Sequence, residues 1–204
     1  MTFLNRLNAT QQLDRIVIDE CHIVLNRRYK FRRQMQRLGK LMAAGTQMVM
    51  LTATLPPSEE EELYRRMYVE KEHVQIFRAS TVRKNVAYRV IDISGIGRKR
   101  DKEKMVLGLI QKNIRKHSTG KVVVYSNTVP KAKTIAESLG CDAYHHHAVG
   151  KEHMLDDFRE GRQPIIVATS ALGMGVDIPD IRCIIHVDRP RTLLDYAQES
   201  GRAG

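Results

Sequence analysis

The sequence contains no tryptophan and only three cysteines in 204 residues. Cys21, Cys141 and Cys183 lie far apart in the chain, and they form neither a CxxC pair nor an even set. Neither a disulfide framework nor a thiolate zinc site is therefore indicated, and a reducing compartment is expected.

Long apolar runs are also absent. The longest ones, at 48–51 and 122–125, are far shorter than a bilayer span, and residues 1–15 contain no apolar core of a signal peptide. We therefore expect a soluble intracellular protein. The chain is long enough for one medium domain or two small ones, each with its own core.

Acidic residues are in the minority. There are 23 Asp and Glu against 34 Lys and Arg, which gives a net charge of +11 and a pI near 9.8. This excess favours a polyanionic partner such as a nucleic acid. A solvated basic surface with no such partner is the alternative.

Short apolar runs rich in β-branched residues alternate with longer amphipathic stretches. This alternation predicts an α/β fold in which helices connect the strands of a parallel sheet. The predicted strands lie at 15–18, 47–51, 74–77, 86–93, 121–125, 164–168 and 183–187. The predicted helices lie at 31–42, from residue 57 onward, at 102–116 and at 130–139. One face of the helix at 31–42 is purely basic, which suits either solvent or nucleic-acid phosphates.

Charged side chains follow the first predicted strand, where the apolar run ends in Asp19, Glu20, Cys21 and His22. In parallel α/β sheets, ligands bind beyond the carboxyl ends of the strands. An Asp at that place can hold magnesium, and a neighbouring Glu can orient or deprotonate a water. For the acidic pair alone, a helix N-cap with a solvated neighbour remains the alternative.

Two hydroxyls, those of Thr52 and Thr54, follow the second strand, so they are expected at the same sheet edge. Together with three later segments, the residues after the first two strands resemble the motifs of a known family, and they occur in the same order as in that family. The segment 19–22 resembles motif II (Walker B) of superfamily 2 DExH helicases, and 52–54 resembles motif III. Residues 122–128, 166–177 and 196–204 resemble motifs IV, V and VI, and the sequence QESGRAG in motif VI is that of the RecQ-like DNA helicases.

The resemblance implies two RecA-like parallel-sheet lobes of the P-loop NTPase type, both incomplete, at 1–81 and 82–204. It implies ATP-dependent unwinding of DNA with three-prime to five-prime polarity. ATP and Mg²⁺ are the implied cofactors, and single-stranded DNA and the duplex junction are the implied partners. The expected compartment is the nucleus.

By the same resemblance, Asp19 would hold magnesium through ATP, and Glu20 would position the attacking water. His22, with Thr52 and Thr54, would transmit the nucleotide state to the DNA strand.

In the second lobe, Gln198 and Arg202 would act on the nucleotide, and we expect them on one helix face if that stretch is helical. Arg202 would also face the acidic pair across a shared ATP cleft. Gly175 and Asp177 would lie beside the nucleotide.

Five residues would contact the nucleic acid, namely Thr52, Thr54, Asn127, Thr128 and Thr169. Thr128 is expected to open a helix with Pro130, where free backbone amides can receive a phosphate.

Several parts of this family pattern are missing from the sequence. No GxxxxGK[ST] phosphate cradle occurs, and motif VI stops before its second arginine. RecQ-like enzymes usually have an aromatic loop with Trp between motifs II and III. Here only Tyr29 and Phe31 are available, and we expect Phe31 to pack in the core. We therefore interpret the chain as a helicase core cut at both ends, with ATPase activity near background.

Three alternatives follow. The chain could bind nucleic acid without catalysis, it could belong to a DExH enzyme that acts on RNA, or it could fail to fold alone because its sheets have open edges. A metal site at His145, His146, His147 and His153 is disfavoured, because no carboxylate or thiolate at ligand spacing completes it.

Overall fold

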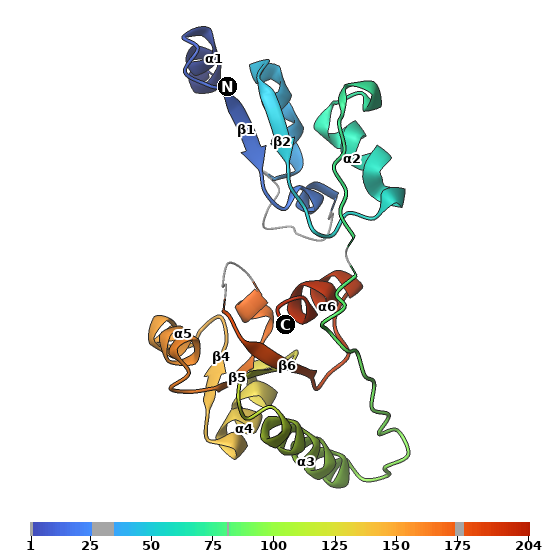
Figure 1. Ribbon diagram of the computed structural model, residues 1–204, viewed down its shortest axis with the longest axis vertical. Coiled ribbons are helices and arrows are strands. Elements are labelled where there is room, and N and C mark those ends of the chain that lie inside the picture. Colours follow the sequence, from blue (N-terminus) through green and yellow to red (C-terminus); the bar gives the residue numbers. More distant parts are fainter. Residues whose placement is uncertain (1, 26–34, 81, 174–177) are drawn as a thin grey trace. The chain divides into compact units, whose positions relative to one another are not determined.

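The computed structural model describes residues 2–25, 35–80, 82–173 and 178–204. The contacts divide the chain into two compact units, Met1–Val82 and Arg83–Gly204. Figure 1 shows the chain from the blue N-terminus to the red C-terminus. Each unit is described separately below.

The first unit is built on two short parallel strands, β1 (Arg15–Ile18) and β2 (Gln47–Met50), in a register that pairs Ile18 with Met50. Between and around them, in order along the chain, lie α1 (Thr2–Ala9), η1 (Cys21–Leu25), η3 (Met35–Ala44), η4 (Pro57–Glu59), α2 (Glu60–Met67) and η5 (Lys71–His73). Both strands match their predicted positions closely.

The core of the first unit joins the end of β1 to η1 and α2. Ile18, Cys21, Val24, Leu63 and Met67 form one cluster, and each is no more than 6% exposed. The helix α2 begins with glutamates in its first turn and ends with arginines in its last, an arrangement that suits the helix dipole. This core therefore anchors the segment that directly follows β1.

The helix predicted at 31–42 differs from the structure. Its described part, η3, has the tighter 3-10 form and runs to Ala44, whereas residues 31–34 lie outside the described residues. η3 packs closely against α2 at Gly39, because a Cβ at this position would overlap the carbonyl oxygen of Arg66. On the basic face, Arg37 and Lys40 are exposed. Tyr29 and Phe31 lie outside the described residues.

The second unit contains a four-stranded parallel sheet in the order β4-β5-β3-β6. Its strands are β3 (Lys121–Tyr125), β4 (Asp142–Tyr144), β5 (Ile165–Ala168) and β6 (Ile181–His186). Its helices are α3 (Lys99–Lys116), α4 (Val129–Leu139), α5 (Lys151–Glu160), η6 (Ser170–Gly173) and α6 (Leu193–Ser200).

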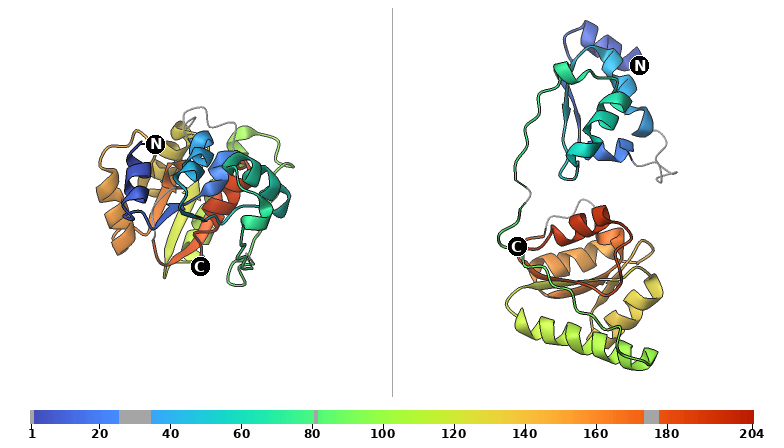
Figure 2. Two further views of the ribbon diagram at one scale, coloured as in Figure 1. Left: turned by 90° about the horizontal axis from the view of Figure 1, so that it is seen from above. Right: turned by 90° about the vertical axis from the view of Figure 1, so that its right-hand side faces the viewer.

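Both faces of this sheet are covered, as the apolar strand β3 requires. Val122 and Val124 pack on one side with residues of α3 and α4, including Ile110 and Ile135. Val123 and Tyr125 pack on the other side, in the cluster that contains Phe158 of α5. Figure 2 shows the two layers of helices on either side of the strands. The uninterrupted apolar run of β3 is therefore that of a central strand.

Two predicted strands are wrong. Residues 74–77 and 86–93 have no strand partner among the described residues, and Phe77 and Val90 are 84% and 96% exposed. Alternating apolar residues predict a strand only when a neighbouring strand can complete the ladder.

No helix in the described part of the chain is long and apolar enough to cross a membrane.

Candidate functional site

The acidic pair lies where β1 ends. Asp19 is exposed, and its Oδ1 atom accepts a hydrogen bond of 2.8 Å from the backbone N–H of Glu20. Glu20 has a φ of 52°, in the left-handed region that residues other than glycine seldom adopt. The chain therefore turns sharply directly after the strand, and local strain of this kind often marks functional sites.

His22 is the centre of a polar cluster behind this turn. Its Nδ1 atom lies 2.9 Å from the Oγ1 atom of Thr52 and 3.1 Å from that of Thr54. The same nitrogen lies 3.1 Å from a carboxylate oxygen of Glu20. The hydroxyl of Thr52 also accepts a hydrogen bond from the backbone N–H of Thr54. The structure thus brings together Glu20, His22, Thr52 and Thr54 at the carboxyl ends of adjacent strands.

Backbone contacts hold this cluster in place. The N–H of Leu51 donates to the carbonyl of Ile18, and the N–H of Cys21 donates to the carbonyl of Leu51. These two bonds extend the pairing of β1 and β2 beyond the strands. They fix the turn that carries Asp19 and Glu20 against the segment that carries Thr52.

Burial sets the charge state of this cluster. His22 is 5% exposed, and its burial lowers its pKa despite the opposing effect of Glu20, Glu59 and Asp19. His22 is therefore neutral at neutral pH, able to donate or accept a hydrogen bond at Nδ1 according to its tautomer. Burial also raises the pKa of the Cys21 thiol to about 11, which keeps this cysteine protonated and unreactive.

In the second unit, a polar corner follows β3. Asn127 and Thr128 lie at the start of α4, where Thr128 is the N-cap with an extended backbone and forms no capping bond through its side chain. The side-chain amide of Asn127 donates to the carbonyl of Arg189 at 2.7 Å. Arg191 donates to the carbonyl of Asn127 at 3.0 Å. The predicted helix opening at Thr128 is confirmed.

Asp188 holds this corner together, although the sequence analysis missed it. Its carboxylate accepts hydrogen bonds from the Ser126 hydroxyl at 3.0 Å, the Asn127 N–H at 2.9 Å and the Lys131 ammonium at 2.5 Å. Burial alone would raise its pKa, but these three donors together hold the pKa of Asp188 below its ordinary value. The signal was the same as for Asp19, a carboxylate that comes directly after an apolar strand.

Thr169 lies at the end of β5, beside the end of β3 in the sheet. It is 8% exposed, and its hydroxyl accepts a bond of 3.4 Å from the N–H of Ala171 within the turn of η6. Its own N–H donates to the carbonyl of Tyr144. Thr169 and Asn127 therefore follow neighbouring strands at one edge of the sheet. Gly175 and Asp177 lie outside the described residues.

Gln198 and Arg202 do not share a helix. Gln198 lies in α6, whereas α6 ends at Ser200 and Arg202 follows in a turn. A common helix face is expected only if the whole stretch is helical, and this condition is not met because the chain leaves the helix before Arg202. The next residue, Glu199, pairs with His186 at 2.9 Å, and both side chains are at most 14% exposed. The ring of His186 stacks on Tyr125 with centroids 5.4 Å apart.

No group of three or more His, Cys, Asp and Glu side chains that could hold a metal ion occurs in the ranges that the structure describes. The predicted site residues fall into two groups, one in each unit. Asp19, Glu20, His22, Thr52 and Thr54 belong to the first unit, and the described residues of motifs IV to VI belong to the second.

Two family models match the chain. The DEAD/DEAH box helicase model matches residues 1–63, and the helicase conserved C-terminal domain matches residues 101–204. The C-terminal match alone covers half of the chain.

Curated relatives match nearly the whole chain. The mouse ATP-dependent DNA helicase Q5 is 32% identical over 98% of the chain, and the Xenopus laevis RecQ-like DNA helicase BLM is 30% identical over 98%. The ATP-dependent DNA helicase RecQ of Pasteurella multocida is 30% identical over 93%. The chain spans only 22%, 15% and 29% of the length of these three proteins.

Solved structures show the fold. Saccharomyces cerevisiae Dbp5 bound to RNA and ADP BeF3 aligns with 98% of the chain and 54% of its own, at a TM-score of 0.63 and 17% identity. Mycobacterium smegmatis helicase Lhr bound to ssDNA and AMP-PNP aligns with 99% of the chain and 29% of its own, at a TM-score of 0.64 and 21% identity. The predicted α/β fold with RecA-like parallel sheets is confirmed, and both sheets are small. The chain belongs to the family with a helicase conserved C-terminal domain, and it is similar over nearly its whole length to RecQ-like DNA helicases.

Proposed function

We propose that this chain carries motifs II to VI of an ATP-dependent DNA helicase that unwinds duplexes with three-prime to five-prime polarity. One observation carries the proposal: the His22 ring lies within hydrogen-bond distance of Thr52 and Thr54, directly behind Asp19 and Glu20. A change at the acidic pair can thereby reach the segment after β2 through one shared imidazole. Residues 1–81 and 82–204 are proposed to be parts of two RecA-like lobes.

In the first unit, Asp19 and Glu20 are proposed to serve the nucleotide. The Asp19 carboxylate is exposed, one of its oxygens accepts from the Glu20 N–H, and carboxylate oxygens are the ligands that Mg²⁺ prefers. The residues present therefore fit a magnesium ion bound with ATP. When bound, the ion supplies charge neutralisation at the phosphates. Glu20 orients the attacking water, and its contact with His22 passes the state of the site to Thr52 and Thr54.

In the second unit, Asn127, Thr128 and Thr169 are proposed to contact the DNA backbone. The position of Thr128 as the N-cap of α4, with no capping bond from its side chain, supports this role, because helix N-termini favour phosphate. Gln198 and Arg202 are proposed to act on the nucleotide.

Gly175 and Asp177 are proposed to lie beside the nucleotide, on the resemblance of their segment to motif V alone. The nucleus is the proposed compartment.

A second candidate function is DNA binding without ATP turnover. It is favoured by the absence of a GxxxxGK[ST] sequence from these 204 residues, because that loop cradles the β and γ phosphates. For the chain alone we therefore expect ATP hydrolysis near background and salt-dependent binding of single strands. The N-terminal half of a helicase core is the partner that would supply the missing loop.

The decisive experiment compares the chain alone with a chimera that places the phosphate-loop segment of a RecQ relative before residue 1. The chimera should hydrolyse ATP when single-stranded DNA is present and unwind three-prime-tailed DNA duplexes. Glu20→Gln should lower the hydrolysis rate by about a hundredfold or more. Glu61→Gln, on the exposed surface of α2, is the matched control and should leave the rate unchanged.

Three outcomes would contradict parts of the proposal. Equal rates for Glu20→Gln and Glu61→Gln would exclude the role of the acidic pair. A preference for RNA duplexes would assign the chain to RNA. Failure of the chimera to turn over ATP, together with salt-dependent DNA binding, would select the non-catalytic function.

A further inference from the structure

The turn after α6 is held by a residue from the other end of the second unit. The Nη1 atom of Arg83 donates to the carbonyl of Gly201 at 2.9 Å, and its Nη2 atom donates to the carbonyl of Ala203 at 2.6 Å. These partners lie 118 and 120 residues away in the sequence. The two carbonyls flank Arg202, so one guanidinium group forms hydrogen bonds to the backbone on both sides of that residue.

This contact has a clear physical reason. Both carbonyls lie just beyond Ser200, the last residue of α6, where the C-terminal end of the helix dipole attracts a cation. A planar guanidinium group can satisfy two such carbonyls at once and fix their relative orientation, which a point charge cannot do. The Nε atom of Arg83 also lies 3.3 Å from the side-chain oxygen of Asn85, which orients the group further.

The rest of the turn is fixed by its own backbone. Gly201 N–H donates to Ala197, and Gly204 N–H donates to the carbonyl of Ile181. A Cβ at Gly201 would lie 2.8 Å from the carbonyl oxygen of Ala197, so the chain passes close to the helix end. Between these two anchored points, the bonds from Arg83 hold the carbonyls on both sides of Arg202.

We infer that Arg83 is a positioning residue for Arg202, which it orients by holding the carbonyls of Gly201 and Ala203. This inference rests on the proposed role of Arg202 at the nucleotide. Arg83 is the first residue of the second unit, so the contact joins the beginning of that unit to the turn that carries Arg202.

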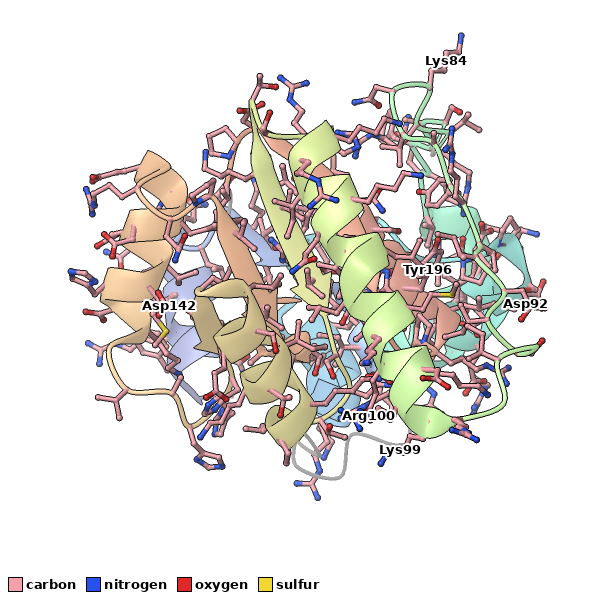
Figure 3. All side chains as sticks on the ribbon, turned by 90° about the horizontal axis from the view of Figure 1, so that it is seen from below. Lys84, Asp92, Lys99, Arg100, Asp142 and Tyr196 are labelled. Carbon is pink, nitrogen blue, oxygen red and sulfur yellow. The ribbon has the colours of Figure 1, made fainter. Side chains whose placement is uncertain are left out.

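The test uses the full chain and the NMR signal of the Arg202 Nε–H group, assigned by its loss in Arg202→Lys. Arg83→Ala should shift or broaden this signal in the free protein, and Arg83→Lys should give an intermediate change. Lys84→Ala is the matched control, because Lys84 is an exposed cation next to Arg83, and its side chain points away from the unit (Figure 3). It should leave the signal unchanged. Thermal unfolding of each variant reports whether it is folded. If Arg83→Ala does not fold, the comparison is made with Arg83→Lys.

Titration with Mg·ATPγS separates this inference from the proposed function. In the chimera that carries the phosphate-loop segment, the nucleotide should shift the Arg202 signal, and Arg83→Ala should weaken the apparent affinity by about tenfold, with partial rescue by Arg83→Lys. No nucleotide-induced shift in this chimera would count against the role of Arg202, while the signals of the free chain would still test Arg83. An Arg202 signal that is identical in folded Arg83→Ala and in the wild type would overturn the inference.

Discussion

The Nδ1 atom of His22 lies 2.9 Å from the hydroxyl of Thr52, thirty residues further along the chain. The register of the parallel pair β1 and β2 makes this contact possible, because Ile18 lies opposite Met50 and both chains leave the sheet at the same edge. The contact therefore depends on strand pairing as well as on local sequence. It joins the two segments that resemble motifs II and III.

Removal of both hydroxyls around His22 should destabilise the first unit. Thr52→Val and Thr54→Val each remove one hydrogen-bond partner of a buried ring, at a cost of about 1 kcal/mol each. The double variant should cost more than either single one, about 2–3 kcal/mol, because the ring nitrogen then loses both hydroxyl partners and keeps Glu20 as its contact among the described residues.

Urea unfolding followed by circular dichroism measures these losses. Ser58→Ala, at an exposed position of the same unit, should change the stability little. A double variant as stable as the wild-type protein would show that the His22 cluster contributes nothing to the fold.

Acid should destabilise the first unit through His22. Burial lowers its pKa in the folded state, so the unfolded chain takes up a proton first as the pH falls. The stability that depends on the neutral ring is therefore full above the ordinary histidine pKa and is lost below it. As the pH falls below the ordinary histidine pKa of about 6.5, the unfolding free energy should fall with a slope of up to about 1.4 kcal/mol per pH unit for this proton.

His22→Gln should flatten that slope, and the measurement is the urea midpoint of the first unit at several pH values. His73→Gln is the control, because His73 is exposed in the same unit. An unchanged slope in His22→Gln would show that another group causes the acid sensitivity.

The positions of the central strands could be predicted from sequence alone. The run at 121–125 is apolar throughout, and the structure places it inside the sheet between β5 and β6. The stretch at 86–93 has a comparable β-branched content, yet it has no ladder among the described residues. The difference lies in the partner strand, which a local pattern does not reveal.

The candidate site shows the same limit. Asp19, His22 and Thr52 were found because each follows an apolar strand, and strand ends meet at one edge of a parallel sheet. The contact between Arg83 and the turn around Arg202 joins residues more than a hundred positions apart, so no local sequence pattern predicts it.

Two glycines should respond in opposite directions to alanine. At Gly39 a Cβ would overlap the Arg66 carbonyl and approach the Tyr68 ring to 2.7 Å, so Gly39→Ala should destabilise the first unit by about 2 kcal/mol or more. At Gly108, inside α3, a Cβ would have no neighbour within 4 Å. Gly108→Ala should therefore stabilise the second unit by about 0.5–1 kcal/mol, through helix propensity and a less flexible unfolded chain.

Thermal unfolding of the two variants checks this pair, and each serves as the control for the other. Equal shifts of the same sign would contradict the close packing of η3 on α2.

Asp188 should contribute to the stability of the second unit and to the shape of the α4 corner. Asp188→Asn keeps the size of the side chain but removes the charge that holds Lys131, so it should cost about 1–3 kcal/mol. Asp188→Ala should cost more, because the Asn127 N–H and the Ser126 hydroxyl also lose their acceptor.

The lowered pKa of Asp188 also predicts how the stability of the second unit depends on pH. Its contribution is full above the ordinary Asp pKa and is lost as the pH falls through the lower folded value, so Asp188→Asn should lose that acid-side dependence. Asp156→Asn, which removes an exposed carboxylate paired with Arg159, is the matched control and should cost less than about 1 kcal/mol.

Because the corner also presents Thr128, single-stranded DNA should bind less tightly to folded Asp188→Ala than to Asp156→Asn, although both lose one negative charge. Equal affinities for the two variants would mean that the corner does not contact the strand.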